Sequence, residues 1–202
     1  MIEEFRILKA GLQVKGLGNN LHTLLITSSG PKEGKSLITA HLALALAESG
    51  RKVMIVDANL RDPVQHKIWN INNAFQGLTS VLQREINDPA EVVQETINRN
   101  LLVVPTGYLP PDPGKVLVSE SLSPFIDEMK KQAEIILFDT PPLLTSSDAA
   151  LLSTKTDGVL LVIAAGMYKR KTVKKAVGLL GSLEVPILGT VLNMADSLDT
   201  VS

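Results

Sequence analysis

Six short runs of apolar residues, rich in Val, Ile and Leu, constrain the fold more than any other feature of this sequence. Each run ends in a turn-forming or acidic residue. Runs without regular polar alternation are typical of strands that are buried on both faces, as in a parallel sheet covered by helices. The runs cover residues 24–29, 52–58, 100–107, 134–142, 158–166 and 186–193.

Helical patterns lie between these runs. Residues 36–50 consist largely of helix-favouring residues and end in a glycine, and residues 169–183 carry apolar residues at helical spacing. The segment 62–100 has weak strand signals, and within it residues 88–100 predict a helix with Pro89 near the first turn. The alternation of strands and helices predicts an α/β domain of three layers, with a mostly parallel central sheet flanked by helices.

Composition limits the class of protein. A chain of 202 residues suits one domain, residues 1–202, better than two. No apolar run reaches the roughly 20 residues that span a bilayer, and the start MIEEFR has no basic region before an apolar core. Zero cysteines exclude disulfides, thiol catalysis and zinc–cysteine sites. We expect a cytoplasmic location.

The charge distribution names no specific nucleic-acid partner. The formal net charge is -1, without the basic excess of a nucleic-acid-binding protein. The basic stretch KRKTVKK, residues 169–175, is best explained as a solvated helix face, because no aromatic residues are interleaved with the charges. Contact with anionic lipid or nucleic acid is the alternative.

The stretch SSGPKEGKS follows the first apolar run and precedes a predicted helix. It fits the P-loop pattern GxxxxGK[ST], in which backbone N–H groups point at phosphate oxygens. Ser29 replaces the first glycine of the pattern, but Gly30 follows it, and Gly34, Lys35 and Ser36 stand in the required order. The alternative is an ordinary helix N-terminus with a serine cap. We favour a phosphate-binding loop, in which Lys35 reaches the β and γ phosphates and Ser36 places its hydroxyl on Mg²⁺.

Two aspartates end the second and fourth runs. Asp57 and Asp139 would lie beyond the carboxyl ends of parallel strands, where such sheets bind ligands. Phosphoryl transfer needs carboxylates for Mg²⁺ or its waters, and a group that orients the nucleophile. Each aspartate alone could equally be a turn residue or a helix cap. Because they accompany a P-loop, we predict Ser36, Asp57 and Asp139 as metal-binding residues and Lys35, Asp57 and Asp139 as catalytic residues.

These motifs, in this order, resemble those of the bacterial tyrosine kinases of capsule and exopolysaccharide synthesis, which use a P-loop ATPase fold. SSGPKEGKS resembles the Walker A motif of the family, VMIVDANLR its Walker A′ motif and IILFDTPP its Walker B motif. GYLPPDPGKVLVSE resembles the family's Pro-Pro-Asn-Pro segment and the helix after it, and GTVLN resembles the last strand. The resemblance covers nearly the whole chain.

The resemblance implies an ATP-dependent protein tyrosine kinase that regulates polysaccharide synthesis and export. Asp57 would accept the proton of the tyrosine hydroxyl or orient a water molecule. Asn193 would hydrogen-bond adenine, although capping the turn after the last strand is the alternative. The residues that would bind ATP or ADP are Ser29, Gly30, Pro31, Glu33, Gly34, Lys35, Ser36, Leu37 and Asn193.

The resemblance also implies partners. Glu3, Arg6 and Lys9 are similar to the spaced Glu-Arg-Arg helix motif with which family members contact a neighbour in a ring, with Lys9 replacing the second arginine. The cytoplasmic tail of a membrane adaptor, of the polysaccharide co-polymerase type, would complete the nucleotide site and bring the chain to the inner face of the plasma membrane. The phosphoacceptor would be a protein tyrosine.

The chain departs from the family pattern at several positions. Asn59 replaces the second aspartate of Walker A′, which removes a negative charge, and Asp112 stands where the family usually has asparagine. The family's C-terminal tyrosine cluster is absent from these 202 residues, in which Tyr108 and Tyr168 are the only tyrosines.

Two other functions stay open at this point. Deviant Walker ATPases act as nucleotide switches, but they carry an extra lysine after the first P-loop position, where this chain has Gly30. A noncatalytic nucleotide-binding partner of a polysaccharide exporter is the second alternative, and Asn59 supports it. Arg61 would contact phosphate or a neighbouring subunit or, as we favour, pair with Asp62 or another surface acid.

Overall fold

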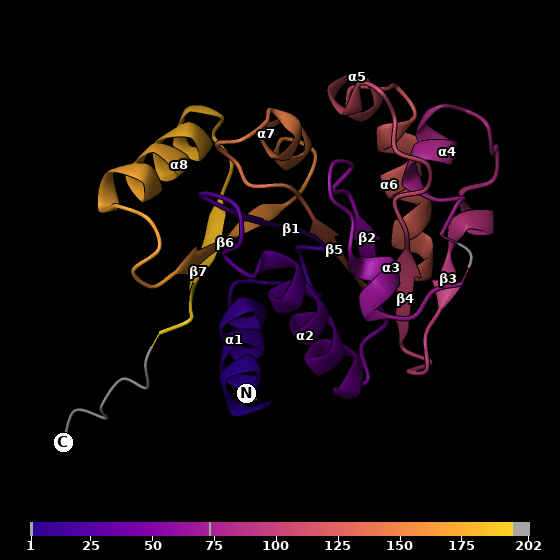
Figure 1. Cartoon of the computed structure of the whole chain (residues 1–202). Helices are drawn as coiled ribbons and strands as arrows, with labels where there is room; N and C mark the ends of the chain where they lie inside the picture. The colour runs from indigo at the N-terminus through magenta and orange to yellow at the C-terminus, as the bar shows by residue number, and fades with distance from the viewer. Residues whose placement is uncertain (1, 73, 196–202) are drawn as a thin grey trace.

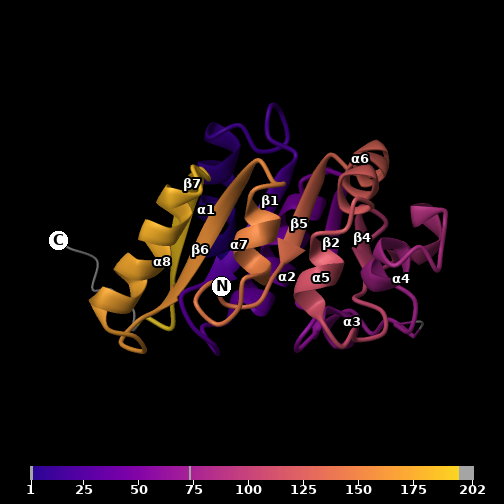
Figure 2. The same cartoon turned by 90° about the horizontal axis from the view of Figure 1, so that it is seen from above.

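The computed structural model describes residues 2–72 and 74–195. A seven-stranded sheet has the order β3-β4-β2-β5-β1-β6-β7, and helices cover both of its faces (Figures 1 and 2). The strands are β1 (Thr23–Ser28), β2 (Val53–Asp57), β3 (Gln94–Glu95), β4 (Leu101–Val104), β5 (Ile135–Asp139), β6 (Gly158–Ala164) and β7 (Ile187–Asn193). The helices are α1 (Ile2–Val14), α2 (Lys35–Glu48), α3 (Gln65–Ile68), α4 (Leu78–Leu82), the 3-10 helix η1 (Pro89–Val92), α5 (Pro113–Leu117), α6 (Leu122–Gln132), α7 (Asp148–Ser153) and α8 (Arg170–Ser182).

The sheet is parallel except at its β3 edge, so the predicted α/β architecture is confirmed. All residues of β1, β2 and β5 are buried. Leu24 and Ile26 of β1 belong to the core under α1 and α2, whereas Leu25 belongs to the core under α6, α7 and α8. Alternate residues thus fill two separate cores, which is why these strands carry consecutive apolar residues. Within the described part of the chain, no helix has both the length and the apolar character needed to cross a membrane.

The prediction of a helix over residues 88–100 is wrong. Only Pro89–Val92 forms a turn of 3-10 helix, whose start is capped by the Asp88 carboxylate accepting from Ala90 N at 2.9 Å. The chain then extends into β3, which pairs antiparallel with β4 through Gln94 opposite Val103. The free edge of β4 offers backbone hydrogen bonds to any segment that passes it, and this tertiary pairing outweighs a weak local helix preference.

The proline-rich loop after β4 ends in a capped helix. Asp112 is the N-cap of α5, and its carboxylate accepts from the backbone N–H of Lys115 at 3.3 Å. Pro113 follows as the first helical residue, where a missing N–H costs nothing. Asp and Asn cap helices about equally well, so the aspartate at position 112 is compatible with the same capped turn.

Candidate active site

The predicted motifs meet at one edge of the sheet. The adjacent strands β1, β2 and β5 run parallel, and Asp57 lies opposite Asp139 in the β2–β5 register. The start of α2 lies beside them, since the Gln65 amide bridges the backbone carbonyl of Ser36 and the Asp139 carboxylate. The structure therefore brings the P-loop and both predicted carboxylates together.

The helix that follows the P-loop presents free backbone donors. Because α2 begins at Lys35, the N–H groups of Lys35, Ser36 and Leu37 have no acceptor within the helix and lie at the positive end of its dipole. Lys35 and Ser36 are partly exposed and Leu37 is exposed. This arrangement is chemically suited to a phosphate group.

Gly34 fits its position by both backbone conformation and space. Its φ of 84° lies in the left-handed region that favours glycine, and a Cβ added there would overlap the side-chain amide of Asn193. That amide donates to the Glu33 carbonyl at 2.9 Å. Asn193, predicted to contact adenine, thus also holds the end of the P-loop, and this bond uses one of its two amide hydrogens.

The Glu33 carboxylate braces the P-loop from inside. It is almost fully buried and accepts from Ser29 Oγ at 2.7 Å, from Gly30 N at 2.7 Å and from Ala164 N at 2.8 Å. The last bond ties the loop to the end of β6. The side chains of Ser29 and Glu33, which were predicted to bind the nucleotide, therefore stabilise the conformation of the loop instead. The Gly30 N–H, also in the predicted set, donates to Glu33.

Tyr168, which sequence analysis gave no role at the site, covers the outer side of the P-loop. Its hydroxyl donates to the Pro31 carbonyl at 3.0 Å, and a Cβ added to Gly30 would overlap its ring. A lysine at position 30, as in deviant Walker ATPases, would have to displace this ring.

The two aspartates are fully buried and differ in their partners. Asp57 accepts from the backbone N–H groups of Asn59 at 3.3 Å, Val64 at 3.0 Å and Gln65 at 2.9 Å. Burial, reinforced by the neighbouring Asp139 charge, raises the pKa of Asp57 to about 8 despite these bonds. Burial likewise raises the pKa of Asp139, and the charge of Lys35 opposes this effect. A proton is therefore available to this carboxylate pair near neutral pH.

Asn59 and Arg61 shape the loop after β2. The Asn59 amide donates to the Asp62 carbonyl at 2.6 Å, and its oxygen accepts from Asp62 N at 3.3 Å. Arg61 forms a bidentate pair with Asp148 at the start of α7, at 2.7 and 3.1 Å. The favoured prediction of an acidic partner for Arg61 was correct in kind, but the partner is a fully buried carboxylate rather than a surface acid.

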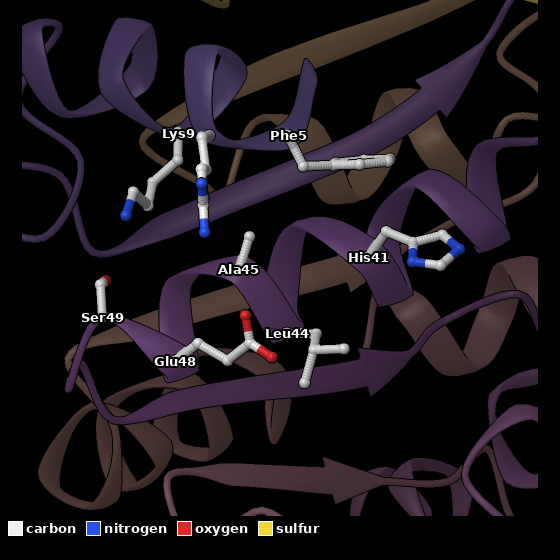
Figure 3. A pocket seen from close by; sticks show the side chains of 8 residues that line it. Phe5, Lys9, His41, Leu44, Ala45, Glu48 and Ser49 are labelled. Carbon is white, nitrogen blue, oxygen red and sulfur yellow. The ribbon is translucent and has the colours of Figure 1, made fainter. Parts of the chain in front are cut away.

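The predicted neighbour-contact residues lie apart from this site. Arg6 pairs with Glu3 at 3.3 Å on the exposed side of α1. Arg6 and Lys9 line a groove of about 410 Å³ between α1 and α2, whose other wall includes Glu48 (Figure 3). The ring of Phe5 lies over His41, with centroids 5.1 Å apart.

Comparison with known proteins extends these observations. Residues 20–200 match the family model ParA, described as NUBPL iron-transfer P-loop NTPase. Over 191 residues the chain is 32% identical to tyrosine-protein kinase YwqD of Bacillus subtilis, covering 95% of this chain and 80% of that protein. The chain belongs to the bacterial tyrosine kinases, within the ParA-type P-loop NTPases. Tyrosine-protein kinase CpsD of Streptococcus agalactiae is 34% identical, with 95% of this chain and 82% of that protein covered.

Solved structures of this family share the fold. The chimerical protein CapA2B2 superposes with a TM-score of 0.90 at 32% identity, covering 96% of this chain and 85% of that one. The kinase domain of the Escherichia coli tyrosine kinase ETK gives a TM-score of 0.88 at 26% identity, covering 100% and 80%. The septum site-determining protein MinD from Pyrococcus horikoshii, solved with Mg-ADP, has a TM-score of 0.72 at 24% identity over 85% and 69%, a likeness of fold alone.

Proposed function

We propose that this chain is an ATP-dependent protein tyrosine kinase of capsule or exopolysaccharide synthesis, working as one domain. One observation carries the proposal: two buried carboxylates, Asp57 and Asp139, lie side by side at the start of a P-loop helix in a chain of this family. A base with a pKa near the working pH is suited to proton transfer, and the pKa of Asp57 is raised to about 8.

The residues present fit Mg²⁺ and a nucleotide. The carboxylate oxygen Asp139 Oδ1 is buried and has no hydrogen-bond partner, which leaves it available to a metal ion or its water. No group of three or more His, Cys, Asp or Glu side chains among the described residues is arranged to hold a metal. Mg²⁺ typically takes only one or two protein carboxylates together with phosphate oxygens and waters. Ser36, Asp57 and Asp139 would hold it, and Mg-ATP would supply the phosphoryl group.

The base of the nucleotide would lie beyond Asn193. A groove of about 590 Å³ there is lined by Leu37, Ile38, His41, Leu192 and Met194 among others. Its volume is within the range of roughly 300–1,000 Å³ for small-molecule sites. Leu37 and the second amide hydrogen of Asn193 would contact the base.

The acceptor tyrosine would approach from the other side of Asp57. A groove of about 430 Å³ is lined by the loop residue Arg61, by Lys67 of α3, and by the exposed rings of Phe75 and Tyr108. Thr106, in the same lining, donates its hydroxyl to the Asp57 carbonyl at 2.7 Å. Within this proposal Lys35 neutralises phosphate charge, Asp139 orients the metal, and Asp57 takes the tyrosine proton.

Two features weigh against the alternative functions. Tyr168 fills the space beside Gly30 that a deviant Walker lysine would need, which disfavours the ATPase switch. Asn59 has a local hydrogen-bonding role in the loop, so its presence is explained without a loss of catalysis. We further infer that the adaptor tail, and a neighbouring subunit at Glu3, Arg6 and Lys9, act as the family pattern implies, which would hold the chain at the inner face of the membrane.

The test supplies the full chain with radiolabelled Mg-ATP and the synthetic polymer poly(Glu,Tyr), and measures phosphotyrosine and released phosphate separately. Lys35→Met and Asp57→Asn should each lower phosphotyrosine formation at least 100-fold, since each removes a group assigned to the transition state. Lys174→Met, an exposed lysine of α8, is the matched control and should retain activity.

The products distinguish the candidate functions. Phosphate release without phosphotyrosine, lost in Lys35→Met, would replace the kinase by an ATPase switch. ADP binding without either product would indicate a noncatalytic module. Undiminished phosphotyrosine formation in Lys35→Met would contradict the P-loop assignment.

A further inference from the structure

Gln65, the first residue of α3, connects three parts of the site. Its side chain is fully buried, and its Nε2 donates to Asp139 Oδ2 at 2.8 Å and to the Ser36 carbonyl at 3.0 Å. Its Oε1 accepts from the indole Nε1 of Trp69 at 3.1 Å. Its backbone N–H donates to Asp57 Oδ2 at 2.9 Å. Both polar atoms of the Gln65 side chain are thus engaged, the amide nitrogen with Asp139 and Ser36 and the amide oxygen with Trp69.

The bond from Gln65 decides which oxygen of Asp139 is available. Oδ2 is occupied, while Oδ1 is buried without a partner. A buried acceptor without a partner is unfavourable and indicates a group that the chain itself does not supply. Because a carboxylate held by one oxygen rotates less freely, the Gln65 amide restricts the direction in which Oδ1 points.

The other end of Gln65 leads away from the metal site. Trp69 is partly buried just after α3, and the neighbouring residues His66 and Lys67 line the groove beside Asp57. The Gln65 side chain therefore joins Asp139 to Trp69 by hydrogen bonds, and the α3 residues between Gln65 and Trp69 include two that line this groove.

We propose that Gln65 is a positioning residue that orients Asp139 toward the metal ion and couples occupancy of the metal site to α3 and Trp69. The inference rests on the proposed function only in requiring that the site take a Mg²⁺-nucleotide. Groups that orient a metal ligand typically contribute about 10–100-fold to metal affinity. Gln65 should therefore contribute to the part of the ADP affinity that depends on Mg²⁺, and not to the part that is independent of it.

The experiment uses Gln65→Met, which keeps the length of the side chain and removes its amide. ADP affinity is measured by calorimetry in excess Mg²⁺ and in EDTA. The tightening of ADP binding by Mg²⁺ should fall at least 10-fold in Gln65→Met, while affinity in EDTA stays at the wild-type value. Gln83→Met, at an exposed position after α4, is the control and should match the wild type in both conditions.

A spectroscopic measurement tests the coupling itself. Trp69 is the only tryptophan of the chain, so tryptophan emission, excited selectively over that of the two tyrosines, reports on it alone. Adding Mg²⁺ to the ADP-bound chain should change the emission in the wild type and in Gln83→Met, but not in Gln65→Met. If Gln65→Met does not fold, the side-chain amide resonance of Gln65 in the ¹⁵N-labelled wild type should shift when Mg²⁺ is added.

Several results would overturn the inference. If Mg²⁺ tightens ADP binding by the same factor in Gln65→Met as in the wild type, the glutamine does not position Asp139. An equal loss of ADP affinity with and without Mg²⁺ would leave it only a structural role, and a Mg²⁺ response of Trp69 that survives in Gln65→Met would refute the coupling. Absence of ADP binding in the wild type would refute both this inference and the nucleotide site. ADP binding without kinase activity would refute only the proposed kinase function, and the role of Gln65 would still be decided by the ADP affinities and the fluorescence.

Discussion

The metal-free chain should lose stability as pH rises through neutrality, because of Asp57. Burial and the Asp139 charge raise the pKa of Asp57 from its ordinary value near 4 to about 8. Between these two values the folded chain holds a proton that the unfolded chain releases. The stabilising contribution is therefore complete below pH 4 and is lost as pH rises toward 8, with a slope of about 1.4 kcal/mol per pH unit. From pH 5 to pH 7 the free energy of unfolding should fall by about 3 kcal/mol, a large part of the roughly 5–15 kcal/mol typical of a domain.

The assay is urea unfolding in EDTA at pH 5, 6, 7 and 8 for the wild type and Asp57→Asn. Asparagine does not titrate, so the variant should lack the Asp57 part of the slope and gain stability relative to the wild type with each pH unit. Asp127→Asn, at an exposed position of α6, should keep the wild-type slope. Parallel pH profiles for the wild type and Asp57→Asn between pH 5 and 7 would mean that Asp57 is ionised in the folded metal-free chain, and the burial argument would then fail.

Two packing contacts of the site give further expectations, both measurable by urea unfolding. Gly30→Ala should displace the Tyr168 ring and lower the free energy of unfolding by about 1 kcal/mol, because the bond from Tyr168 to the P-loop is lost. The same change should cost clearly less in a Tyr168→Ala background. Additive costs of the two changes would contradict the contact. Arg61→Ala should cost about 2 kcal/mol, below the roughly 3–5 kcal/mol for a fully buried pair, because water can reach the half-exposed arginine side. Arg84→Ala breaks only exposed contacts, an ion pair with Glu120 and a hydrogen bond to Ser121, and should leave stability nearly unchanged. An equal loss in both variants would refute the role of burial.

The strands could be predicted because burial on both faces requires consecutive apolar residues, and such runs are visible in a single sequence. β1, β2 and β5 present apolar residues to both cores, and short apolar runs of this kind favour buried strands. β7 has a similar apolar sequence but is only half-buried, since it lies at the edge of the sheet. Its position in the sheet order could not be predicted from composition.

β3 and η1 could not be predicted for a different physical reason. Their sequence has weak preferences, and the outcome depends on an edge of β4 that is formed by residues further along the chain. Val92, the last residue of η1, is fully buried, so the segment is anchored by packing rather than by its own propensity.

At the site, the sequence predicted the groups attached to strand ends and missed the contacts that join distant segments. Asp57 and Asp139 follow directly from their places after apolar runs. The Glu33 bond to Ala164 N and the Tyr168 bond to the Pro31 carbonyl each span more than 100 residues of sequence, and no local pattern marks them. Gln65 had one signal, its place eight positions after Asp57, but a glutamine there is also typical of an ordinary short helix.

Asn59 illustrates how the structure changes the meaning of a departure from a family pattern. The residue is buried, and its amide both donates to and accepts from the Asp62 backbone, which closes the loop that presents Arg61 to Asp148. An aspartate could accept from Asp62 N but could not donate to the Asp62 carbonyl unless it were protonated. It would also add a third carboxyl group near Asp57, whose pKa is already raised by burial and by Asp139. The Asn59 amide therefore closes this turn without adding a buried negative charge beside Asp57 and Asp139, the two carboxylates that we propose as Mg²⁺ ligands.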